Sequence, residues 1–398
     1  MTTPEEHPNA HTTVVVVGGG YAGVVAANRL RVDPGVAVTL VNPRPAFVER
    51  IRLHQLLTGS DDARVDYAHV LSADVRLLVD TADRIDASTR TVALGSGATI
   101  GYDYLVYAVG STGAADVPGV AAFARSVSDW ESAQALRAAL ARIDPGAPVV
   151  VVGAGPTGIE TAAELAEQGR AVTLVCGGVL GPYFAAPARR AVARRMRTLG
   201  VTVVEGPGTT AVEVRADAVR LADGRLLPSA ITIWTAGFDV PDLAARSGLT
   251  TDAVGRLLTD ETLTSVDSPF VVAAGDAATP SGQPLRMSCQ AAMPLGAQAA
   301  NTVLSRIAGT PPATVEQAFT GQCVSLGRRG AVVQLAHLDD RVMPVYLGGR
   351  AAAAVKELVC RGTIAFLARE ARTPGSYVWL KGGKRANSLA AVESAPAR

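Results

Sequence analysis

The sequence predicts an α/β protein built from two similar units, because one glycine-rich pattern occurs twice in its 398 residues. The first copy reads VVVVGGGYAG and places Gly18, Gly20 and Gly23 directly after an apolar run. The second copy reads PVVVVGAGPTGIE and spans residues 148–160. Later in each unit, an apolar run ends in glycine, as YLVYAVG and then ITIWTAG. We therefore predict two Rossmann-like, dinucleotide-binding domains followed by a small C-terminal α+β domain.

Each glycine of the pattern has its own physical task. The first permits a tight turn, the second lets phosphates approach the backbone, and the third lets the helix pack close to the strand. In the second copy these positions are Gly153, Gly155 and Gly158. The N–H groups that open the helix then face a pyrophosphate. Two copies in one chain predict two bound dinucleotides.

The first unit begins as a strand, a helix and a strand. We expect these elements at residues 14–17, 22–31 and 36–41. The helix ends before Asp33-Pro34-Gly35, which is a turn signal. A Rossmann unit usually ends its second strand with Asp or Glu, which binds a ribose hydroxyl. Here Asn42 takes that place, and its amide can still hydrogen-bond a ribose.

The second unit repeats this order. Its expected elements are a strand at 149–152, a helix at 157–168, a strand at 171–175 and a later strand at 231–237. The later strand corresponds to residues 102–110 of the first unit, and Pro118-Gly119 reads as the linker between the units. The second strand of this unit runs into Cys176, so this unit also lacks the usual carboxylate.

A later motif predicts that the chain returns to its first unit. Residues 266–278, VDSPFVVAAGDAA, read as a strand ending in Gly275-Asp276. We therefore predict a discontinuous first domain at 12–118 and 260–310, interrupted by a second domain at 119–259. The C-terminal domain would span 311–398, with short strands at 324–327, 331–335 and 342–347.

The C-terminal domain also contains a helix predicted over residues 351–372. Apolar side chains such as Val355, Leu358 and Phe366 alternate there with charged ones, which is an amphipathic pattern. Such a helix either packs on the first domain or lies on a bilayer. We favour the packed arrangement, because no second long apolar stretch follows it.

Composition narrows the class of function. The chain is 48% hydrophobic and 18% charged, which suits a large folded core. Its net charge of +1 does not indicate the basic surface of a nucleic-acid-binding protein. No apolar run reaches the roughly 18 residues of a membrane span. The polar start is unlike a signal peptide. We expect a cytoplasmic protein that contacts the inner face of the membrane at most peripherally.

Cysteine and histidine spacing excludes two further kinds of site. The cysteines Cys176, Cys289, Cys323 and Cys360 include no CxxC or CxxxxC pair, so a local redox-active disulfide is not expected. No cluster of metal ligands is visible in the sequence either. We therefore expect no metal.

The ordered motifs resemble those of the two-dinucleotide flavoprotein superfamily. More narrowly, the chain is similar to type II NADH dehydrogenases and apoptosis-inducing-factor-like oxidoreductases. The matching motifs are GGGYAG near the N-terminus, RLHQLLTG at 52–59, YLVYAVGS at 104–111, GAGPTGIETAAELAE at 153–167, TAGF at 235–238, AAGDAA at 273–278 and SLGRRGAVV at 325–333. They span most of residues 14–333.

The resemblance implies FAD at the first fingerprint and NAD(P)H at the second. For FAD it implies Gly18, Gly20, Tyr21, Ala22, Gly23, Asn42, Arg52, Gly110, Gly275 and Asp276. For NAD(P)H it implies Gly153, Gly155, Pro156, Thr157, Gly158, Cys176 and Gly237. Asp276 would hold the ribityl chain, since a carboxylate accepts hydroxyl hydrogen bonds well. The alternative is that Asp276 only caps the following helix.

Three side chains are candidates for a catalytic role by this resemblance. Glu160, in the first turn of the second fingerprint helix, would lie near the nicotinamide and the flavin, and it also complements the helix dipole. His54, within RLHQLLTG, would donate to the flavin or the acceptor unless its role is structural. Gln290 keeps the first glutamine of the AQxAxQ helix of quinone-reducing relatives. Pro294 replaces the second glutamine and is expected to disturb that helix or mark its first turn.

These departures leave the donor and the acceptor open. At the second fingerprint Cys176 does not supply the carboxylate that favours NADH, and Arg189 and Arg190 are the arginines that can fold back to a 2′-phosphate. The changed quinone motif admits a different quinone, another small molecule or oxygen as acceptor.

We predict an FAD-dependent NAD(P)H oxidoreductase that passes hydride from NAD(P)H to FAD, and then electrons to a quinone-type acceptor. The alternatives are a reductase of a protein electron carrier such as ferredoxin, a reductase of a soluble aromatic metabolite, and a low-turnover, redox-responsive flavoprotein. A sulfide:quinone reductase would also fit the superfamily, although the cysteine spacing does not support it. The oligomeric state stays open, with a homodimer among the options.

Overall fold

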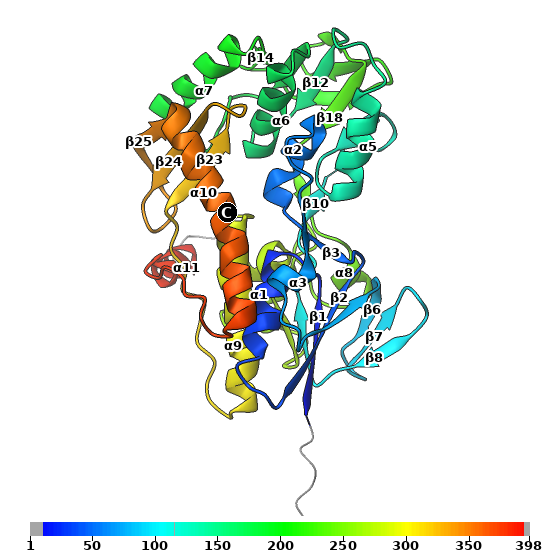
Figure 1. The fold of residues 1–398 in the computed structure, drawn as a ribbon, viewed down its shortest axis with the longest axis vertical. Coiled ribbons are helices and arrows are strands. Elements are labelled where there is room, and N and C mark those ends of the chain that lie inside the picture. Colours follow the sequence, from blue (N-terminus) through cyan, green and yellow to red (C-terminus); the bar gives the residue numbers. More distant parts are fainter. Residues whose placement is uncertain (1–10, 115, 394–398) are drawn as a thin grey trace, which may run out of the picture.

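The computed structural model describes residues 11–114 and 116–393. We compared the polar N-terminal residues with a signal peptide, and these residues lie largely outside the described ranges. Two sheets stand one above the other in Figure 1, and the C-terminal segments run along their side. Within the described residues, no helix is both long and apolar enough to cross a bilayer.

The lower sheet of Figure 1 holds the first fingerprint. Its strand order is β21-β9-β1-β2-β5, and all its pairings are parallel. The strands are β1 (Thr12–Val17), β2 (Val36–Asn42), β5 (Arg76–Val79), β9 (Tyr104–Tyr107) and β21 (Val271–Ala273). Because β21 pairs with β9, the chain returns to its first sheet after building the second. Val14 to Val17 are all buried, as expected when helices and loops cover both faces of a parallel sheet.

The upper sheet repeats this plan. Its order is β11-β18-β12-β13-β14, again with parallel pairings. The strands are β11 (Ala124–Ser126), β12 (Val149–Val152), β13 (Val172–Val175), β14 (Thr202–Val204) and β18 (Ile231–Trp234). In both sheets the strand before the glycine pattern is central. These matching sheets confirm the α/β fold class with two Rossmann-like units.

A small antiparallel sheet precedes the late strand of each unit, which extends the similarity. The first unit contains β6 (Ala82–Asp86), β7 (Thr91–Leu94) and β8 (Thr99–Gly101), and the second contains β15 (Ala211–Val214), β16 (Ala218–Leu221) and β17 (Leu226–Pro228). The late strands β9 and β18 are shorter than expected, since they stop at Tyr107 and Trp234. Beyond them the chain turns at Gly110 and Gly237, both of which have positive φ.

Helices connect the two units as well as covering the sheets. The fingerprints lead into α1 (Tyr21–Leu30) and α6 (Pro156–Glu167), and the other longer helices of the two units are α5 (Trp130–Leu140), α7 (Ala186–Thr198) and α9 (Cys289–Ile307). The short α2 (Leu53–Thr58) belongs to the first unit by sequence but packs against α5 and α6 of the second. Its His54 is thereby carried to the second fingerprint helix.

Short elements complete the two units. They are β3 (Ala46–Val48), η1 (Arg50–Arg52), β4 (Arg64–Asp66), α3 (Tyr67–Val70), β10 (Thr112–Gly113), α4 (Val120–Phe123), β19 (Phe238–Asp239), α8 (Leu243–Arg246), β20 (Leu257–Thr259), η2 (Gly275–Ala277) and β22 (Ala278–Pro280). Strands β10 and β19 pair where the chain passes between the units, with Thr112 opposite Asp239. The two segments that pass between the units are therefore hydrogen-bonded to each other.

The helix α9 corrects one of our expectations. It is a continuous helix of 19 residues, and Pro294 lies inside it rather than disturbing it or marking its first turn. Proline has no N–H, so the carbonyl of Gln290 loses its usual helical donor. The side chain of Gln317 replaces that donor, with Nε2 lying 2.9 Å from the Gln290 carbonyl oxygen. Tertiary structure thereby allows a proline that local sequence disfavours.

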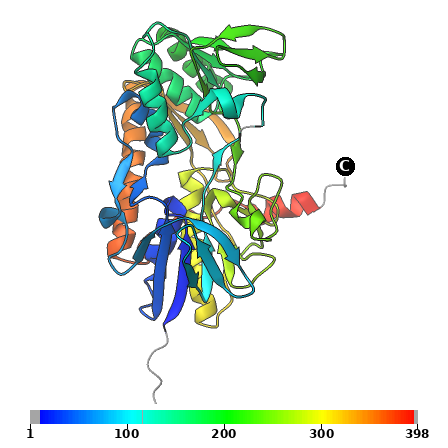
Figure 2. The same cartoon turned by 90° about the vertical axis from the view of Figure 1, so that its right-hand side faces the viewer.

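The C-terminal part adds a three-stranded antiparallel sheet and a long helix. The sheet consists of β23 (Gly321–Ser325), β24 (Ala331–Ala336) and β25 (Val342–Gly348), and the helix is α10 (Gly349–Arg372). Helix α10, orange in Figure 1, runs past both units and packs on α1, α3 and β24. The final helix, α11 (Arg385–Glu393), extends away from the body in Figure 2.

Helix α10 departs from an ordinary amphipathic surface helix, because it buries two charged side chains and exposes several apolar ones. Its buried face carries Ala352, Lys356, Cys360, Thr363, Leu367 and Glu370. The buried Glu370 pairs with the buried Arg29 of α1, which compensates its charge. Leu358 and Phe366 point outward and are 70% and 49% exposed. The predicted packing is therefore found on one face of α10, while the opposite face exposes apolar side chains.

Candidate functional site

The two fingerprints adopt the same backbone geometry. Gly18 and Gly153 have φ of +104° and +112°, values that favour glycine. A Cβ on Gly23 would lie 1.8 Å from the carbonyl oxygen of Gly18, and a Cβ on Gly158 would lie 1.8 Å from that of Gly153. Both helices therefore approach their turns so closely that no side chain fits.

The middle glycines leave open space in front of the helices. A Cβ on Gly20 or Gly155 would meet no atom within 4 Å. These two residues are the N-caps of α1 and α6, and neither helix start is capped by a side chain. Unpaired N–H groups that face open space at a helix N-terminus fit a pyrophosphate. Each cradle therefore fits one dinucleotide.

Polar side chains hold the first cradle in shape. Asn42 accepts a hydrogen bond from the backbone N–H of Gly19 at 3.0 Å and donates to the carbonyl of Arg44 at 2.8 Å. Tyr67 donates its hydroxyl hydrogen to the carbonyl of Gly19 at 2.8 Å. The structure thus shows Asn42 supporting the turn, and its predicted contact with a ribose stays a prediction.

Tyr21 supplies an unused polar group beside this cradle. Its hydroxyl is buried and has no hydrogen-bond partner among the described residues. Burial, with smaller contributions from Cys289 and Glu49, raises the pKa of Tyr21 well above its ordinary value, so the group stays a neutral donor. A buried orphan hydroxyl next to the helix start is an observation that fits a bound cofactor.

Asp276 lies where the chain returns to the first sheet. Gly275, with φ of +71°, turns the backbone directly before it. The Asp276 carboxylate accepts a hydrogen bond from Ser111 at 2.8 Å, and Arg50 donates to the same Ser111 hydroxyl at 3.2 Å. Arg52 pairs with the carboxylates of Glu49, Asp61 and Glu357, and its predicted contact with FAD stays a prediction.

Glu160 is the centre of a buried polar cluster that we call the Glu160 cluster. It comprises Glu160 on α6, His54 on α2, Ser325 at the end of β23 and Lys356 on α10. The Glu160 carboxylate accepts the backbone N–H of Ser325 at 3.0 Å and forms an ion pair with the Lys356 ammonium. His54 bridges the set, because Nδ1 lies 3.5 Å from Glu160 Oε2 and Nε2 lies 3.2 Å from the Ser325 hydroxyl.

Burial and charge set the protonation states of this cluster. Burial lowers the pKa of His54 to about 4, although the Glu160 carboxylate opposes the shift, so His54 is neutral at pH 7. Burial alone would raise the pKa of Glu160, but Lys356 and His54 outweigh it and hold that pKa below its ordinary value. The Glu160 carboxylate likewise outweighs burial at Lys356 and raises its pKa. Glu160 and Lys356 are therefore a charged pair.

The structure brings two of the three predicted catalytic residues together. Gln290 lies elsewhere, where its side chain accepts from Arg286 at 3.1 Å and donates to Thr320 at 2.9 Å. The sequence reasoning missed Ser325 and Lys356. Ser325 opens the SLGRRGAVV motif, and Lys356 is one of only three lysines in the chain, so both carried a weak signal.

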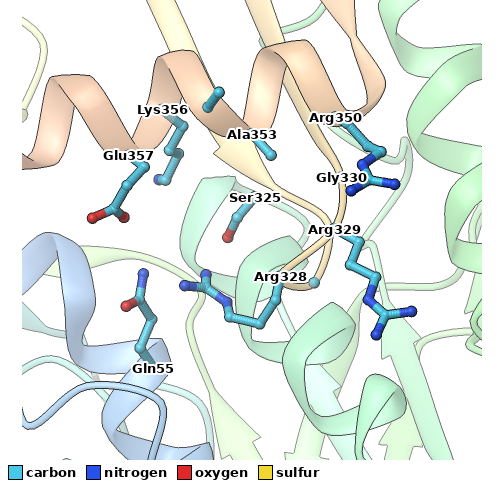
Figure 3. A pocket seen from close by; sticks show the side chains of 11 residues that line it. Gln55, Ser325, Arg328, Arg329, Gly330, Arg350, Ala353, Lys356 and Glu357 are labelled. Atoms are coloured by element: carbon cyan, nitrogen blue, oxygen red, sulfur yellow. The ribbon is translucent and has the colours of Figure 1, made fainter.

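A cavity of about 370 Å³ adjoins the Glu160 cluster. Figure 3 shows Lys356 and Glu357 reaching it from α10 and Gln55 from α2 on the opposite side. Its cationic lining also includes Arg328, Arg329 and Arg350. Lys356 and Ser325 are the two cluster members that line the cavity, and both contact Glu160, which lies behind them.

The cysteines supply no evident nucleophile. All four are free. Burial, followed by the charge of Glu205, raises the pKa of Cys176 to about 12, and burial raises the pKa of Cys289 to about 12 and of Cys360 to about 11. Such thiols are almost wholly protonated at pH 7 and thus poor nucleophiles. Among the described residues, no three His, Cys, Asp or Glu side chains gather to hold a metal.

The two cradles agree with the family match. Residues 12–296 match the family described as pyridine nucleotide-disulphide oxidoreductase. The chain belongs to this family. Membership of this family makes the protein an oxidoreductase that binds FAD and NAD(P)H. The predicted resemblance to the type II NADH dehydrogenase branch is confirmed by similar proteins of known family.

Three similar proteins illustrate the range of relatives. An NADH dehydrogenase-like protein of Mycobacterium tuberculosis is 32% identical over 352 residues, covering 81% of this chain and 87% of that protein. The type II NADH:quinone oxidoreductase Ndh of the same organism is 27% identical and covers 85% and 83%. A biphenyl dioxygenase system ferredoxin–NAD(+) reductase component of Paraburkholderia xenovorans is 30% identical and covers 70% and 69%.

Solved structures show the same fold at lower identity. The sulfide:quinone oxidoreductase of Aquifex aeolicus superimposes with a TM-score of 0.77 at 20% identity, covering 91% of this chain and 92% of that one. NDH2 of Plasmodium falciparum in complex with NADH gives a TM-score of 0.74 at 16% identity and covers 92% and 99%. The domain limits and the roles of individual site residues stay predictions.

Proposed function

We propose that this protein passes electrons from NAD(P)H, through FAD, to a quinone-type acceptor. The observation that carries the proposal is the Glu160 cluster, which joins the second fingerprint helix to the wall of a cavity. When bound, FAD supplies a two-electron carrier that accepts hydride and passes electrons on. The similarity to a type II NADH:quinone oxidoreductase supports the choice of acceptor.

The chain's own residues orient the reactants and manage protons. The Gly20 and Gly155 cradles would hold the pyrophosphates of the two dinucleotides, which would orient the two cofactors for hydride transfer. Reducing a quinone to a quinol takes two electrons and two protons, whereas hydride carries only one proton. Lys356 lines the cavity and its ammonium is fixed by Glu160, so Nζ is placed to stabilise negative charge on a quinone oxygen until the second proton arrives from solvent.

A protein electron carrier is the second candidate acceptor. The similarity to a ferredoxin–NAD(+) reductase component supports it. Arg329 and Arg350 are exposed on the cavity side, and neither makes an ion pair with another described residue. Free cations on a surface favour an acidic partner.

The acceptor could instead be a soluble aromatic metabolite. Steady-state turnover with any acceptor would argue against a redox-responsive flavoprotein of low turnover.

Peripheral contact with a membrane accompanies the quinone proposal. The outward face of α10 presents Leu358 and Phe366 between cationic side chains such as Arg361. Apolar groups flanked by arginines suit the surface of an anionic bilayer. A cytoplasmic location with peripheral attachment to the inner face of the membrane is therefore part of the proposal.

Anaerobic stopped-flow absorbance tests the proposal. The FAD-loaded protein is mixed with NADH or NADPH and then with a short-chain quinone. We expect rapid bleaching of the flavin band, followed by rapid reoxidation. Bleaching by neither nucleotide would contradict the hydride-transfer step, whereas bleaching without reoxidation would exclude quinone and favour a protein carrier.

A cavity variant tests whether the acceptor approaches through the cavity. Ala353→Trp places a large ring among the lining residues, and Ala351→Trp changes an exposed position of the same helix outside the lining. We expect Ala353→Trp to slow reoxidation by quinone about tenfold, equivalent to about 1.4 kcal/mol of barrier, and to leave bleaching unchanged. Equal reoxidation rates in both variants would place the acceptor elsewhere.

A further inference from the structure

The second nucleotide unit lacks a carboxylate at the usual place but has one on the next strand. Strand β13 runs into Cys176, where Rossmann units commonly carry an acid. Strands β13 and β14 are parallel neighbours, with Thr173 opposite Thr202 and Val175 opposite Val204. The register therefore sets Glu205 beside Cys176 as each strand ends, at the carboxyl edge where dinucleotides bind.

Two contacts verify this placement. The backbone N–H of Cys176 donates to the carbonyl of Val204 at 2.9 Å, so the pairing continues to the last residue of each strand. The Glu205 carboxylate accepts the backbone N–H of Leu180 at 3.0 Å. Leu180 belongs to the loop that follows Cys176, so Glu205 is held against that loop rather than directed away from it.

The same loop also contacts the fingerprint. The N–H of Gly181 donates to the carbonyl of Ala154, which lies between the first two glycines of the pattern, at 3.1 Å. The N–H of Gly206 donates to the carbonyl of Gly178. Residues 177–181 therefore span from the pyrophosphate cradle to Glu205. In a Rossmann unit the adenosine ribose lies between the cradle and the end of the second strand.

We infer that Glu205 replaces the missing acid and makes the second site selective for NADH over NADPH. The carboxylate side chain of Glu205 is exposed to solvent at the end of β14. A negative charge beside the ribose tolerates a 2′-hydroxyl and repels a 2′-phosphate. The inference rests on binding of NAD(P)H at the second fingerprint and adds which of the two nucleotides is bound.

An arginine beside the ribose would favour NADPH, and the two arginines that the sequence offers for this role lie on α7. Arg189 on α7 is fixed to the main chain, because its guanidinium donates to the carbonyl of Phe184 at 3.0 Å. Arg190 is exposed on the following position of the helix. A 2′-phosphate would have to recruit these side chains from α7, whereas the Glu205 carboxylate already lies against the nucleotide loop.

The test compares binding of NAD⁺ and NADP⁺ to the FAD-loaded protein by calorimetry. Glu205→Gln removes the charge and keeps an oxygen for the N–H of Leu180. Asp217→Asn is the control, since it removes an exposed carboxylate from the turn between β15 and β16 of the same unit. We expect the wild type to favour NAD⁺ about tenfold, and Glu205→Gln to reduce that ratio several-fold while Asp217→Asn preserves it.

A second variant keeps the inference falsifiable if Glu205→Gln loosens the loop. Adding Cys176→Glu to Glu205→Gln returns a carboxylate to the usual position, and we expect it to restore the preference for NAD⁺. A wild type that prefers NADP⁺, or a Glu205→Gln variant that loses both nucleotides equally, would overturn the assignment. These binding measurements need no turnover, so they are independent of whether a quinone is the acceptor.

Discussion

At the scale of single residues, the Glu160 cluster is a buried charge pair stabilised by its neighbours. Glu160 and Lys356 are 6% and 8% exposed, so each would be costly to bury without the other. Ser325 and His54 satisfy further hydrogen-bonding capacity of the carboxylate. Removing either charge would leave its partner unpaired in the interior, which typically destabilises a protein by about 3–5 kcal/mol.

His54 predicts a loss of stability in mild acid. Its pKa is about 4 in the folded protein, against about 6.5 in an unfolded chain. Between these values the unfolded chain binds a proton that the folded protein excludes, so stability is full above pH 6.5 and falls as the pH drops toward 4. The whole loss would be roughly 3 kcal/mol.

Urea unfolding of the FAD-loaded protein from pH 7.5 to pH 5 measures this effect. We expect His54→Gln to flatten the dependence of the unfolding free energy on pH in this range. His69→Gln, at an exposed position of α3, is the control and should keep the wild-type slope. An unchanged slope in His54→Gln would show that His54 is not excluded from protonation in the folded state.

At the scale of elements, α9 shows how a helix tolerates an internal proline. Pro294 deprives the Gln290 carbonyl of its helical donor, and Gln317 from the C-terminal part supplies another. The helix also lies unusually close to α1, because a Cβ on Gly296 would be only 2.2 Å from the carbonyl oxygen of Ala22. Both features depend on packing between distant segments.

A double-mutant cycle tests the compensation at Pro294. Pro294→Ala restores an N–H that can donate to the Gln290 carbonyl, so Gln317 is no longer needed there. We expect Gln317→Leu to cost about 1 kcal/mol more of unfolding free energy with Pro294 than with Ala at that position. Gln298→Leu is the control, since Gln298 bonds the carbonyl of Ala313 instead. Equal costs in both backgrounds would disprove the coupling.

At the scale of the whole molecule, α10 joins the two nucleotide-binding units and shapes the outer surface. Its buried face supplies Lys356 to the second unit and Glu370 to the first. With these charged residues turned inward, apolar residues of the same helix are left outside. The helix thus contacts both units with its buried face and presents an apolar strip, which includes Leu358 and Phe366, on its exposed face.

The apolar strip predicts binding to phospholipid vesicles. We expect the protein to float with vesicles that contain anionic phospholipid, and Leu358→Glu to weaken this binding about tenfold, since burying a leucine contributes about 1.5–3 kcal/mol. Leu226→Glu is the control, because Leu226 is similarly apolar and exposed but lies on β17 of the second unit. Equal flotation of the two variants would exclude α10 as the contact.

The sequence by itself determined the two dinucleotide cradles and the α/β fold. Glycine at Gly18 or Gly153 is required by a local turn, and a short apolar run followed by a helix needs no distant residue to be recognised. The same locality predicted the return of the chain at Gly275-Asp276. Strand ends differed from the prediction, since β9 and β18 stop where their pairing with neighbouring strands stops and not where the apolar sequence stops.

Tertiary structure alone decided the composition of the Glu160 cluster. Its members come from α2, α6, β23 and α10, and the pairing of Glu160 with Lys356 joins residues 196 positions apart. It also decided that Gln290 lies apart from them, that Pro294 sits within α9, and that Glu205 stands beside Cys176. Each of these depends on which strands and helices become neighbours, and the free energy that selects neighbours comes from burying whole faces rather than from any local pattern.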